Sequence, residues 1–354
     1  MNQDSASRSL IPAFLCWFAL AFTALASTAQ AQGDLRFADL GEFPLESGQT
    51  IKVCKIGYRT YGELNRDKSN AILFPSWFGG TSKDLAQFVN PSGPVDSSKY
   101  FVVTVDAIGN GISSSPSNSA TEGGKAFPKF SIRDMVESQR RLLTEVLGIS
   151  HLHAVMGISM GGIQTFQWIV GHPDFMDNAI SIVGSPRMDP YTLLLFQTEL
   201  NAIEELLAAH SDPHKGRAAA MRVVADVHQL ALSTPPKYNA ENSREEFAGK
   251  LATIEAELIQ RMDPYDWASQ LRAIIGHDVS ARLGGNMQRA AEAVNAQLLV
   301  IVGLRDHMVT PDSALDFAKR TGARTLALDS DCGHLAFACE IEQVRGAVRG
   351  FLEE

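Results

Sequence analysis

The chain has 354 residues, of which 45% are hydrophobic and 20% are charged, and its 31 Lys and Arg against 40 Asp and Glu give a formal net charge of −9 at pH 7. This balance excludes a disordered or low-complexity protein, because such chains carry too little apolar surface to offset the conformational entropy lost on folding. The acidic balance also argues against a nucleic-acid partner, since binding to phosphates needs a cationic surface that displaces their counterions.

The N-terminal segment has the pattern of a secretory signal peptide. Arg8 precedes an apolar run over residues 10–25, which is followed by an Ala-Gln-Ala exit at residues 29–31. A short positive start, an apolar stretch too brief for a comfortable membrane span and small exit residues predict cleavage after Ala31. The alternative is an N-terminal anchor that is not cleaved. We expect a soluble periplasmic or secreted protein that has no membrane segment once residues 1–31 are removed.

Strand and helix patterns alternate between residue 50 and about residue 184. Four largely apolar runs, of which the first two are nearly unbroken, predict strands that are covered on both faces. These runs span residues 71–74, 101–105, 152–156 and 178–183. Apolar residues at helical spacing predict helices over residues 132–147 and 162–170. This alternation indicates a parallel sheet with helices on both faces.

The strand pattern disappears between about residues 186 and 285 and then returns. Three amphipathic helices are predicted in this stretch, at residues 193–209, 216–232 and 245–262. The elements predicted after it are strands at 298–302 and 325–328 and helices at 313–320 and 340–352. We therefore interpret residues 32–185 and 286–354 as an α/β core and residues 186–285 as a helical cap or lid. The alternative is a second helical domain with its own role.

A candidate nucleophile lies between a predicted strand and a predicted helix. Residues 157–161 have the sequence Gly-Ile-Ser-Met-Gly, which matches the G-x-S-x-G motif of a nucleophile elbow. In such an elbow Ser159 occupies a strained turn that presents its hydroxyl at the carboxyl edge of the sheet. The alternative is a glycine-rich turn in which the serine caps the helix. The strand–motif–helix order favours the elbow.

A serine hydroxyl needs a base, and His334 is the candidate that can reach Ser159. His334 stands in the loop after the last predicted strand, and that loop opens on the same sheet edge as the elbow. The base in turn needs a carboxylate, for which Asp306, three residues beyond the strand at 298–303, has the right position. The competing acids are Asp312, Asp316, Asp329 and Asp331. The order Ser, Asp, His is that of α/β-hydrolases, whereas a purely structural role for His334 is the alternative.

Two backbone amides are candidates for the oxyanion hole. The amide of Met160 lies at the start of the helix, where the helix dipole adds to its hydrogen bond. The second donor should come from the loop after the strand at 71–74, and we assign it to Trp77, with Phe78 as a close rival. In the alternative interpretation, Gly79 and Gly80 only turn the chain.

Cysteine usage and ligand spacing indicate neither a disulfide framework nor a metal. Cys54, Cys332 and Cys339 remain after removal of the leader, and we expect all three to be buried thiols, although a loop that curls back would let Cys332 and Cys339 pair. No spacing resembles a metal site, and the expected chemistry needs no cofactor.

Several segments of the mature chain resemble homoserine O-acetyltransferases. They lie at residues 57–65, 70–73, 100–103, 108–111, 114–116, 127–128, 132–136, 157–162 and 271–279, with Gln164 and Trp168 also matching. The resemblance implies an α/β-hydrolase fold, a mostly parallel sheet flanked by helices, with an inserted helical lid. It also implies Ser159, Asp306 and His334 as the catalytic triad, and a homodimer that forms through the lid.

The chain departs from the acetyltransferase pattern at three positions. Pro75 stands where the family has a histidine before its oxyanion loop, and Leu335 stands where it has an aspartate for the amino group of homoserine. Leu200 lies near the place of the arginine that binds the substrate carboxylate. A zwitterionic amino acid would meet an apolar wall there, at a cost of several kcal/mol. Activity therefore should not be inferred from the family name.

The expected function is hydrolysis of a small acyl ester, thioester or lactone through an acyl-enzyme. Acetyl-CoA is a cytoplasmic thioester, so an exported enzyme would pass its acyl group to water or to an external alcohol. Three alternatives stay open: an acyltransferase in the style of the family, a non-catalytic binding protein on the same scaffold, and a hydrolase of amides or C–C bonds. We expect a small-molecule partner and no nucleic acid.

Overall fold

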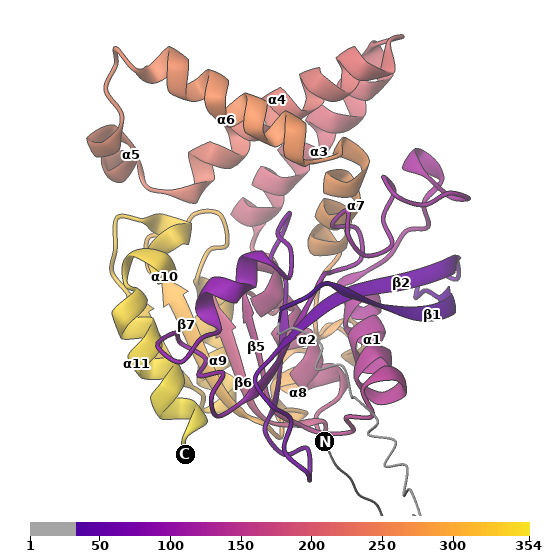
Figure 1. Cartoon of the computed structure of the whole chain (residues 1–354). Helices are drawn as coiled ribbons and strands as arrows, with labels where there is room; N and C mark the ends of the chain where they lie inside the picture. The colour runs from indigo at the N-terminus through magenta and orange to yellow at the C-terminus, as the bar shows by residue number, and fades with distance from the viewer. Residues whose placement is uncertain (1–32) are drawn as a thin grey trace, which may run out of the picture. The chain divides into compact units, whose positions relative to one another are not determined.

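The computed structural model of the protein describes residues 33–354. The predicted signal peptide, residues 1–31, lies outside these residues. The described chain is built from alternating strands and helices, followed by a run of helices and a return to strands (Figure 1). No helix within residues 33–354 has both the length and the apolar character needed to cross a bilayer.

Within residues 33–354 the strands form one eight-stranded sheet with the order β1-β2-β4-β3-β5-β6-β7-β8. The strands are β1 (Arg36–Pro44), β2 (Thr50–Tyr61), β3 (Ala71–Pro75), β4 (Phe101–Val105), β5 (Leu152–Ile158), β6 (Met176–Ile182), β7 (Gln297–Gly303) and β8 (Arg324–Leu328). Strands β3 to β8 are parallel, as predicted, whereas β1 and β2 extend one edge in antiparallel pairing. No prediction covered β1.

The central strands are buried on both faces, which explains their largely apolar sequences. In β3, Ala71 and Leu73 face one hydrophobic cluster, while Ile72 and Phe74 face the other. The first cluster includes side chains of α1 (Ile132–Arg141), α2 (Met160–Gly171), α8 (Met287–Glu292) and α9 (Asp312–Thr321). The second includes side chains of α11 (Ile341–Leu352) and of the short 3-10 helix Asp84–Phe88. The predicted helices on both faces of the sheet are thus confirmed.

A block of helices separates β6 from β7. It contains α3 (Pro190–Ala209), α4 (Pro213–Leu232), α5 (Pro235–Glu241), α6 (Phe247–Arg261) and α7 (Pro264–Ile275). Figure 1 shows α3, α4 and α6 together beyond one end of the sheet. The three predicted helices are present, whereas α5 and α7 were not predicted. The assignment of residues 186–285 as a cap stays an interpretation.

Proline fixes where these helices begin. Helices α3, α4, α5 and α7 each carry Pro in their first turn, where the missing amide hydrogen costs nothing. Side chains of Asp212, Thr234 and Asp263 cap the starts of α4, α5 and α7. The connections between the helices are therefore short and well defined.

Cys332 and Cys339 form a disulfide, so the expectation of three buried thiols was wrong for this pair. The residues between them form a 3-10 helix, Gly333–Leu335, and the short helix α10 (Ala336–Cys339). These two turns bring the two Cα atoms to 6.5 Å, within the range that a disulfide can bridge. Cys54 is a free, buried thiol, and its burial raises its pKa to about 12.

Candidate active site

Ser159 occupies a strained turn between β5 and α2. Its backbone has φ 55° and ψ −120°, a conformation that residues other than glycine rarely adopt. The flanking glycines allow strand and helix to approach, because a Cβ on Gly157 would clash with the carbonyl group of Gly161, and one on Gly161 would lie 2.6 Å from the carbonyl oxygen of Pro75. The amide of Ser159 donates to the carbonyl oxygen of Ile182, 2.8 Å away. The local geometry is that of a nucleophile elbow.

His334 joins Ser159 to Asp306 through two hydrogen bonds. Its Nδ1 lies 2.7 Å from Oδ2 of Asp306, and its Nε2 lies 2.9 Å from Oγ of Ser159. A carboxylate can only accept, so Nδ1 carries the hydrogen and Nε2 accepts the serine hydroxyl. His334 and Asp306 are each 4% exposed, so bulk water does not compete strongly for these bonds.

The carboxylate of Asp306 is itself fixed by the backbone. Its Oδ1 accepts hydrogen bonds from the amides of Met308 and Val309, at 2.9 and 3.0 Å, while Oδ2 faces His334. The competing acids lie elsewhere: Asp312 and Asp316 are exposed on α9, and Asp329 and Asp331 form ion pairs with Arg305. The strand-end position of Asp306 is the one that reaches the imidazole.

Two amides of the loop after β3 are free to bind an oxyanion. The amide of Ser76 donates to Val105, that of Gly79 to Oε1 of Gln270 and that of Gly80 to the carbonyl oxygen of Trp77. Within the described chain the amides of Trp77 and Phe78 have no acceptor. The same is true of Met160, the first residue of α2, where a helix offers no acceptor. Trp77 and Phe78 therefore both stay candidates for the second oxyanion donor.

Buried polar side chains hold this loop in place. Gln164 of α2 donates from Nε2 to the carbonyl oxygen of Ser76 over 3.1 Å and accepts from Gln139 of α1 over 2.6 Å. Asp106, after β4, accepts from the amide and the hydroxyl of Ser82 at 2.7 and 2.6 Å. Burial raises the pKa of Asp106 above its usual value. Both ends of the loop are therefore anchored.

A cavity of about 770 Å³ opens above Ser159. Its wall is mostly apolar and includes Trp77, Phe78, Phe196 and Trp267, with Ser159 and His334 at one end. The space suits a small to medium acyl ester, because pockets of this volume are typical for small organic ligands.

The buried carboxyl group of Glu199, on α3, was not predicted from the sequence. Glu199 of α3 is 0% exposed, accepts from Nδ1 of His228 on α4 at 3.0 Å and accepts from the indole of Trp267 on α7 at 2.9 Å. His228 and Trp267 both line the cavity. One side chain therefore links three helices of the cavity wall. An acid within an amphipathic helix pattern gives no sign of such burial.

Only one of the three departures from the acetyltransferase pattern faces the cavity. Leu335 lines it and is 37% exposed, whereas Leu200 is buried in the core and is not part of the cavity wall. Pro75 ends β3, with its carbonyl oxygen against Gly161. Among residues 33–354, no group of three or more His, Cys, Asp or Glu side chains is placed to hold a metal ion.

Comparisons with known proteins agree with the fold described above. A family model described as the alpha/beta hydrolase fold matches residues 72–339. A probable esterase of Corynebacterium glutamicum is 33% identical over 324 residues, which cover 87% of this chain and 91% of that protein. An ethyl acetate hydrolase of Pseudomonas veronii is 32% identical over 307 residues, which cover 82% of this chain and 86% of that protein.

Homoserine O-acetyltransferases match as well, which confirms the resemblance noted in the sequence. That of Methanosalsum zhilinae is 29% identical over 359 residues, covering 88% of this chain and 71% of that protein. Among solved structures, an acetylester hydrolase from Corynebacterium glutamicum superposes with a TM-score of 0.84 at 29% identity, covering 91% of this chain and 96% of that chain.

Proposed function

The chain belongs to the α/β-hydrolase fold family, and we propose that within it the protein is an exported serine hydrolase that cleaves a small ester-type acyl substrate. The observation that carries this proposal is the hydrogen-bonded chain from Ser159 through His334 to Asp306 at the end of the cavity. The esterases among its relatives support the same reaction class.

The proposed reaction has two steps. Ser159 Oγ attacks the ester carbonyl while His334 Nε2 takes its proton, and the protonated ring then gives that proton to the departing alcohol. A water molecule next gives a proton to His334 Nε2 as its oxygen attacks the acyl-enzyme, and the protonated ring returns this proton to Ser159 Oγ as the bond to the acyl group breaks and the acid leaves. Asp306 fixes the tautomer of the ring and stabilises the imidazolium. The amides of Met160 and of Trp77, or of its rival Phe78, stabilise the oxyanion in both steps.

Acyl transfer to an alcohol is the second candidate, and the homoserine O-acetyltransferases among the relatives favour it. Leu335 on the cavity wall argues against homoserine as the acceptor, because it stands where the acetyltransferases carry the aspartate that binds the amino group of homoserine. The predicted export argues against acetyl-CoA as the donor. Water is therefore the acceptor that we propose.

Hydrolysis of 4-nitrophenyl acetate and ethyl acetate by the purified protein tests the proposal. We expect Ser159→Ala to abolish turnover and covalent labelling by a fluorophosphonate, and Asp306→Asn to leave a small residual rate. Near-normal activity of Ser159→Ala would show the assignment to be wrong. Adding homoserine separates the two candidates, because only a transferase would form O-acetylhomoserine.

Export is tested separately. The mature protein from the periplasm or the medium should begin at Gln32, as N-terminal sequencing or mass spectrometry will show. A chain that keeps residues 1–31 and stays with the membrane would favour the uncleaved anchor.

A further inference from the structure

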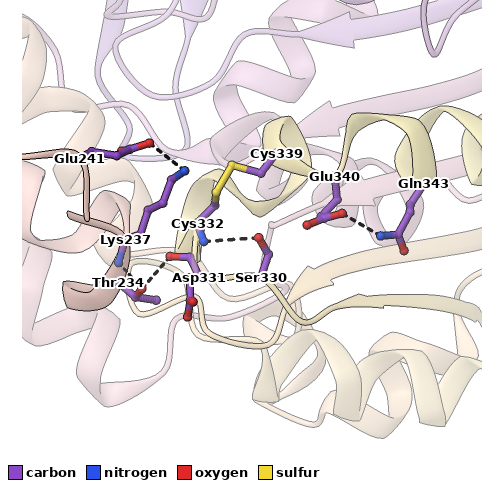
Figure 2. Close-up of a disulfide and its surroundings, with 9 residues drawn as sticks. All are labelled: Thr234, Lys237, Glu241, Ser330, Asp331, Cys332, Cys339, Glu340 and Gln343. Atoms are coloured by element: carbon purple, nitrogen blue, oxygen red, sulfur yellow. Dashed lines mark hydrogen bonds and ion pairs between the residues drawn. A yellow bond between two sulfur atoms is a disulfide. The ribbon is translucent and has the colours of Figure 1, made fainter. Parts of the chain in front are cut away.

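The disulfide between Cys332 and Cys339 encloses His334 in the sequence. The 3-10 helix Gly333–Leu335 carries the imidazole, and α10 runs from there to Cys339. The bridge therefore closes a ring of backbone that contains His334 and little else. Figure 2 shows the bridge between the start of this loop and the end of α10, with Thr234 and Asp331 beside it. A shift of the His334 backbone relative to β7 and β8 therefore also displaces this disulfide-closed segment.

The non-covalent contacts of the start of the loop with Ser330 and Arg305 are long or exposed. The amides of Cys332 and Gly333 lie 3.4 Å from the hydroxyl and the carbonyl oxygen of Ser330, at the outer limit of a hydrogen bond. The ion pair of Asp331 with Arg305 joins side chains that are about half exposed, and such pairs contribute little. The disulfide is therefore the strongest constraint between the two ends of the loop.

The cap contacts the loop at the residue before the bridge. Thr234, which caps α5, donates to the carbonyl oxygen of Asp331 from its hydroxyl at 2.7 Å and from its amide at 3.1 Å. Gly333, with φ 60°, passes so close to Ser233 that a Cβ there would lie 3.2 Å from its Cα. If the ring opened, the cap would hold only the side of the loop that precedes His334.

The bridge is open to a small reductant. Cys332 is 5% exposed, but Cys339 is exposed to solvent, and both line a second cavity of about 660 Å³. That cavity shares Gln229, Ile254 and Leu335 with the cavity above Ser159, but Cys332 and Cys339 line only the second cavity. A reagent can therefore reach the sulfur atoms without passing through the catalytic cavity.

On the basis of the function proposed above, we propose that the Cys332–Cys339 disulfide is a positioning element that keeps His334 within hydrogen-bond distance of Ser159. Reduction by a dithiol breaks the S–S bond: the dithiol is oxidised to its own disulfide, and its two protons and two electrons convert the bridge into two thiols. The loop then loses its covalent closure. The imidazole of His334 then samples positions beyond hydrogen-bond distance of Ser159 and Asp306. The base is therefore misplaced in a fraction of the reduced protein molecules.

The test compares oxidised and reduced forms of the full chain purified without reductant. After incubation with dithiothreitol, and at a temperature where circular dichroism shows a folded protein, kcat for 4-nitrophenyl acetate should fall roughly ten- to a hundredfold, as misplacement of a catalytic group does. KM should change by less than about twofold, because the apolar cavity wall is retained. Reoxidation with glutathione disulfide should restore kcat.

Variants assign the effect to the bridge. The double variant Cys332→Ala/Cys339→Ala should show the lowered kcat without reductant and no further response to it. Cys54→Ala removes the free buried thiol on β2, and it should respond to reductant as the original protein does. A response that followed Cys54 would overturn the proposal.

Three results would contradict the positioning role. The first is a kcat within about twofold of that of the oxidised protein, although thiol titration shows that the disulfide is reduced. The second is a change in KM that accounts for the lost activity, and the third is unfolding of the reduced protein at every assay temperature. Failure of the proposed function can be told apart from these results, because the oxidised protein would then hydrolyse none of the esters tested. In that case the rate of fluorophosphonate labelling of Ser159, oxidised against reduced, still reports whether the bridge positions His334.

Discussion

The side chain of Gln270 accepts a hydrogen bond from the amide of Gly79 over 3.1 Å, although the two residues lie 191 positions apart in the sequence. Gln270 belongs to α7 and is 0% exposed, and Gly79 belongs to the loop that carries Trp77 and Phe78. The bond satisfies the amide of Gly79, so that this donor does not compete for the oxyanion. It also fixes the direction of the two neighbouring amides that stay free.

Replacing Gln270 by Met should therefore lower the catalytic rate. The variant keeps the volume but leaves the amide of Gly79 without its acceptor, at a cost of about 1–3 kcal/mol to folding. It also loosens the loop, and we expect kcat for a short acyl ester to fall roughly tenfold. Steady-state kinetics at a temperature where the variant is folded will measure this.

Gln167 of α2 offers the matched control. It is 2% exposed, and its Nε2 has no partner among the described residues. Gln167→Met removes an unsatisfied donor and should leave kcat unchanged and stability equal or higher. Equal loss of kcat in the two variants would mean that Gln270 has no special relation to the oxyanion loop.

Acid should destabilise the protein through His277. Burial lowers the pKa of this side chain from 6.5 to about 3, so between these values the unfolded chain binds a proton that the folded chain does not. Stability is therefore full above pH 6.5 and falls as the pH decreases towards 3. Between about pH 7 and pH 4.5 this group should cost about 2–3 kcal/mol of unfolding free energy.

His277→Leu, which has no titratable group, isolates this contribution. Urea unfolding at both pH values should show a smaller acid-induced loss in the variant, by the amount given above. Parallel losses in the two proteins would show that His277 is not the origin.

Asp266 should have the opposite pH dependence. Burial raises its pKa from 3.8 to about 6, although the amide and hydroxyl of Ser117 donate to its two oxygens at 2.8 and 2.5 Å. The folded protein binds this proton more tightly, so stability falls as the pH rises from about 4 to about 6. Asp266→Asn keeps partners for Ser117 without a charge. At neutral pH it should raise the unfolding free energy by up to about 3 kcal/mol.

At a pH near 4 the two proteins should have similar stability, since the carboxyl group is then largely protonated in the folded state. Thermal unfolding across this range provides the measurement. If Asp266→Asn were less stable than the original protein at neutral pH, the buried carboxylate would be contributing a favourable interaction that this argument omits.

The number of free thiols in the exported protein should show both whether the Cys332–Cys339 disulfide is formed and whether residues 1–31 have been removed. The sequence holds Cys16, Cys54, Cys332 and Cys339. If Cys332 and Cys339 are paired and residues 1–31 are removed, the unfolded, unreduced chain should give one thiol, Cys54. In the folded protein Cys54 should not react, because it is 0% exposed and burial raises its pKa.

Retention of the leader would raise the unreduced count from one to two, and an open bridge would raise it by two more. Mass spectrometry of maleimide-labelled protein distinguishes these cases. Cys54→Ala is the control, and it should give no label before reduction when the leader is absent and the bridge is closed.

The parts of the site that follow from local geometry could be predicted from the sequence. Ser159 lies in a motif whose strand, turn and helix are continuous in the chain. His334 and Asp306 could be named because parallel strands end at one edge, so residues just after β7 and β8 are brought towards the elbow. The structure places these three side chains together.

The features that escaped prediction depend on contacts between distant segments. Glu199 meets His228 and Trp267 at separations of 29 and 68 residues, and Gln270 meets Gly79 at 191. Helical periodicity shows which face is apolar but not which polar group lies against it. The pairing of Cys332 with Cys339 depended on two tight turns, for which the composition of the loop gave no clear signal.

The helical segment from α3 to α7 enters the chain between β6 and β7, which are direct neighbours in the sheet. Its length and sequence can therefore vary without moving the register of any strand or the turn at Ser159. Helices α3 to α6 supply Phe196, His228 and Leu258 to the cavity wall, whereas Ser159, Asp306 and His334 lie outside them. A graft of these helices from a relative should therefore change which substrates fit, provided that the hydrogen bond from Thr234 to the His334 loop is kept.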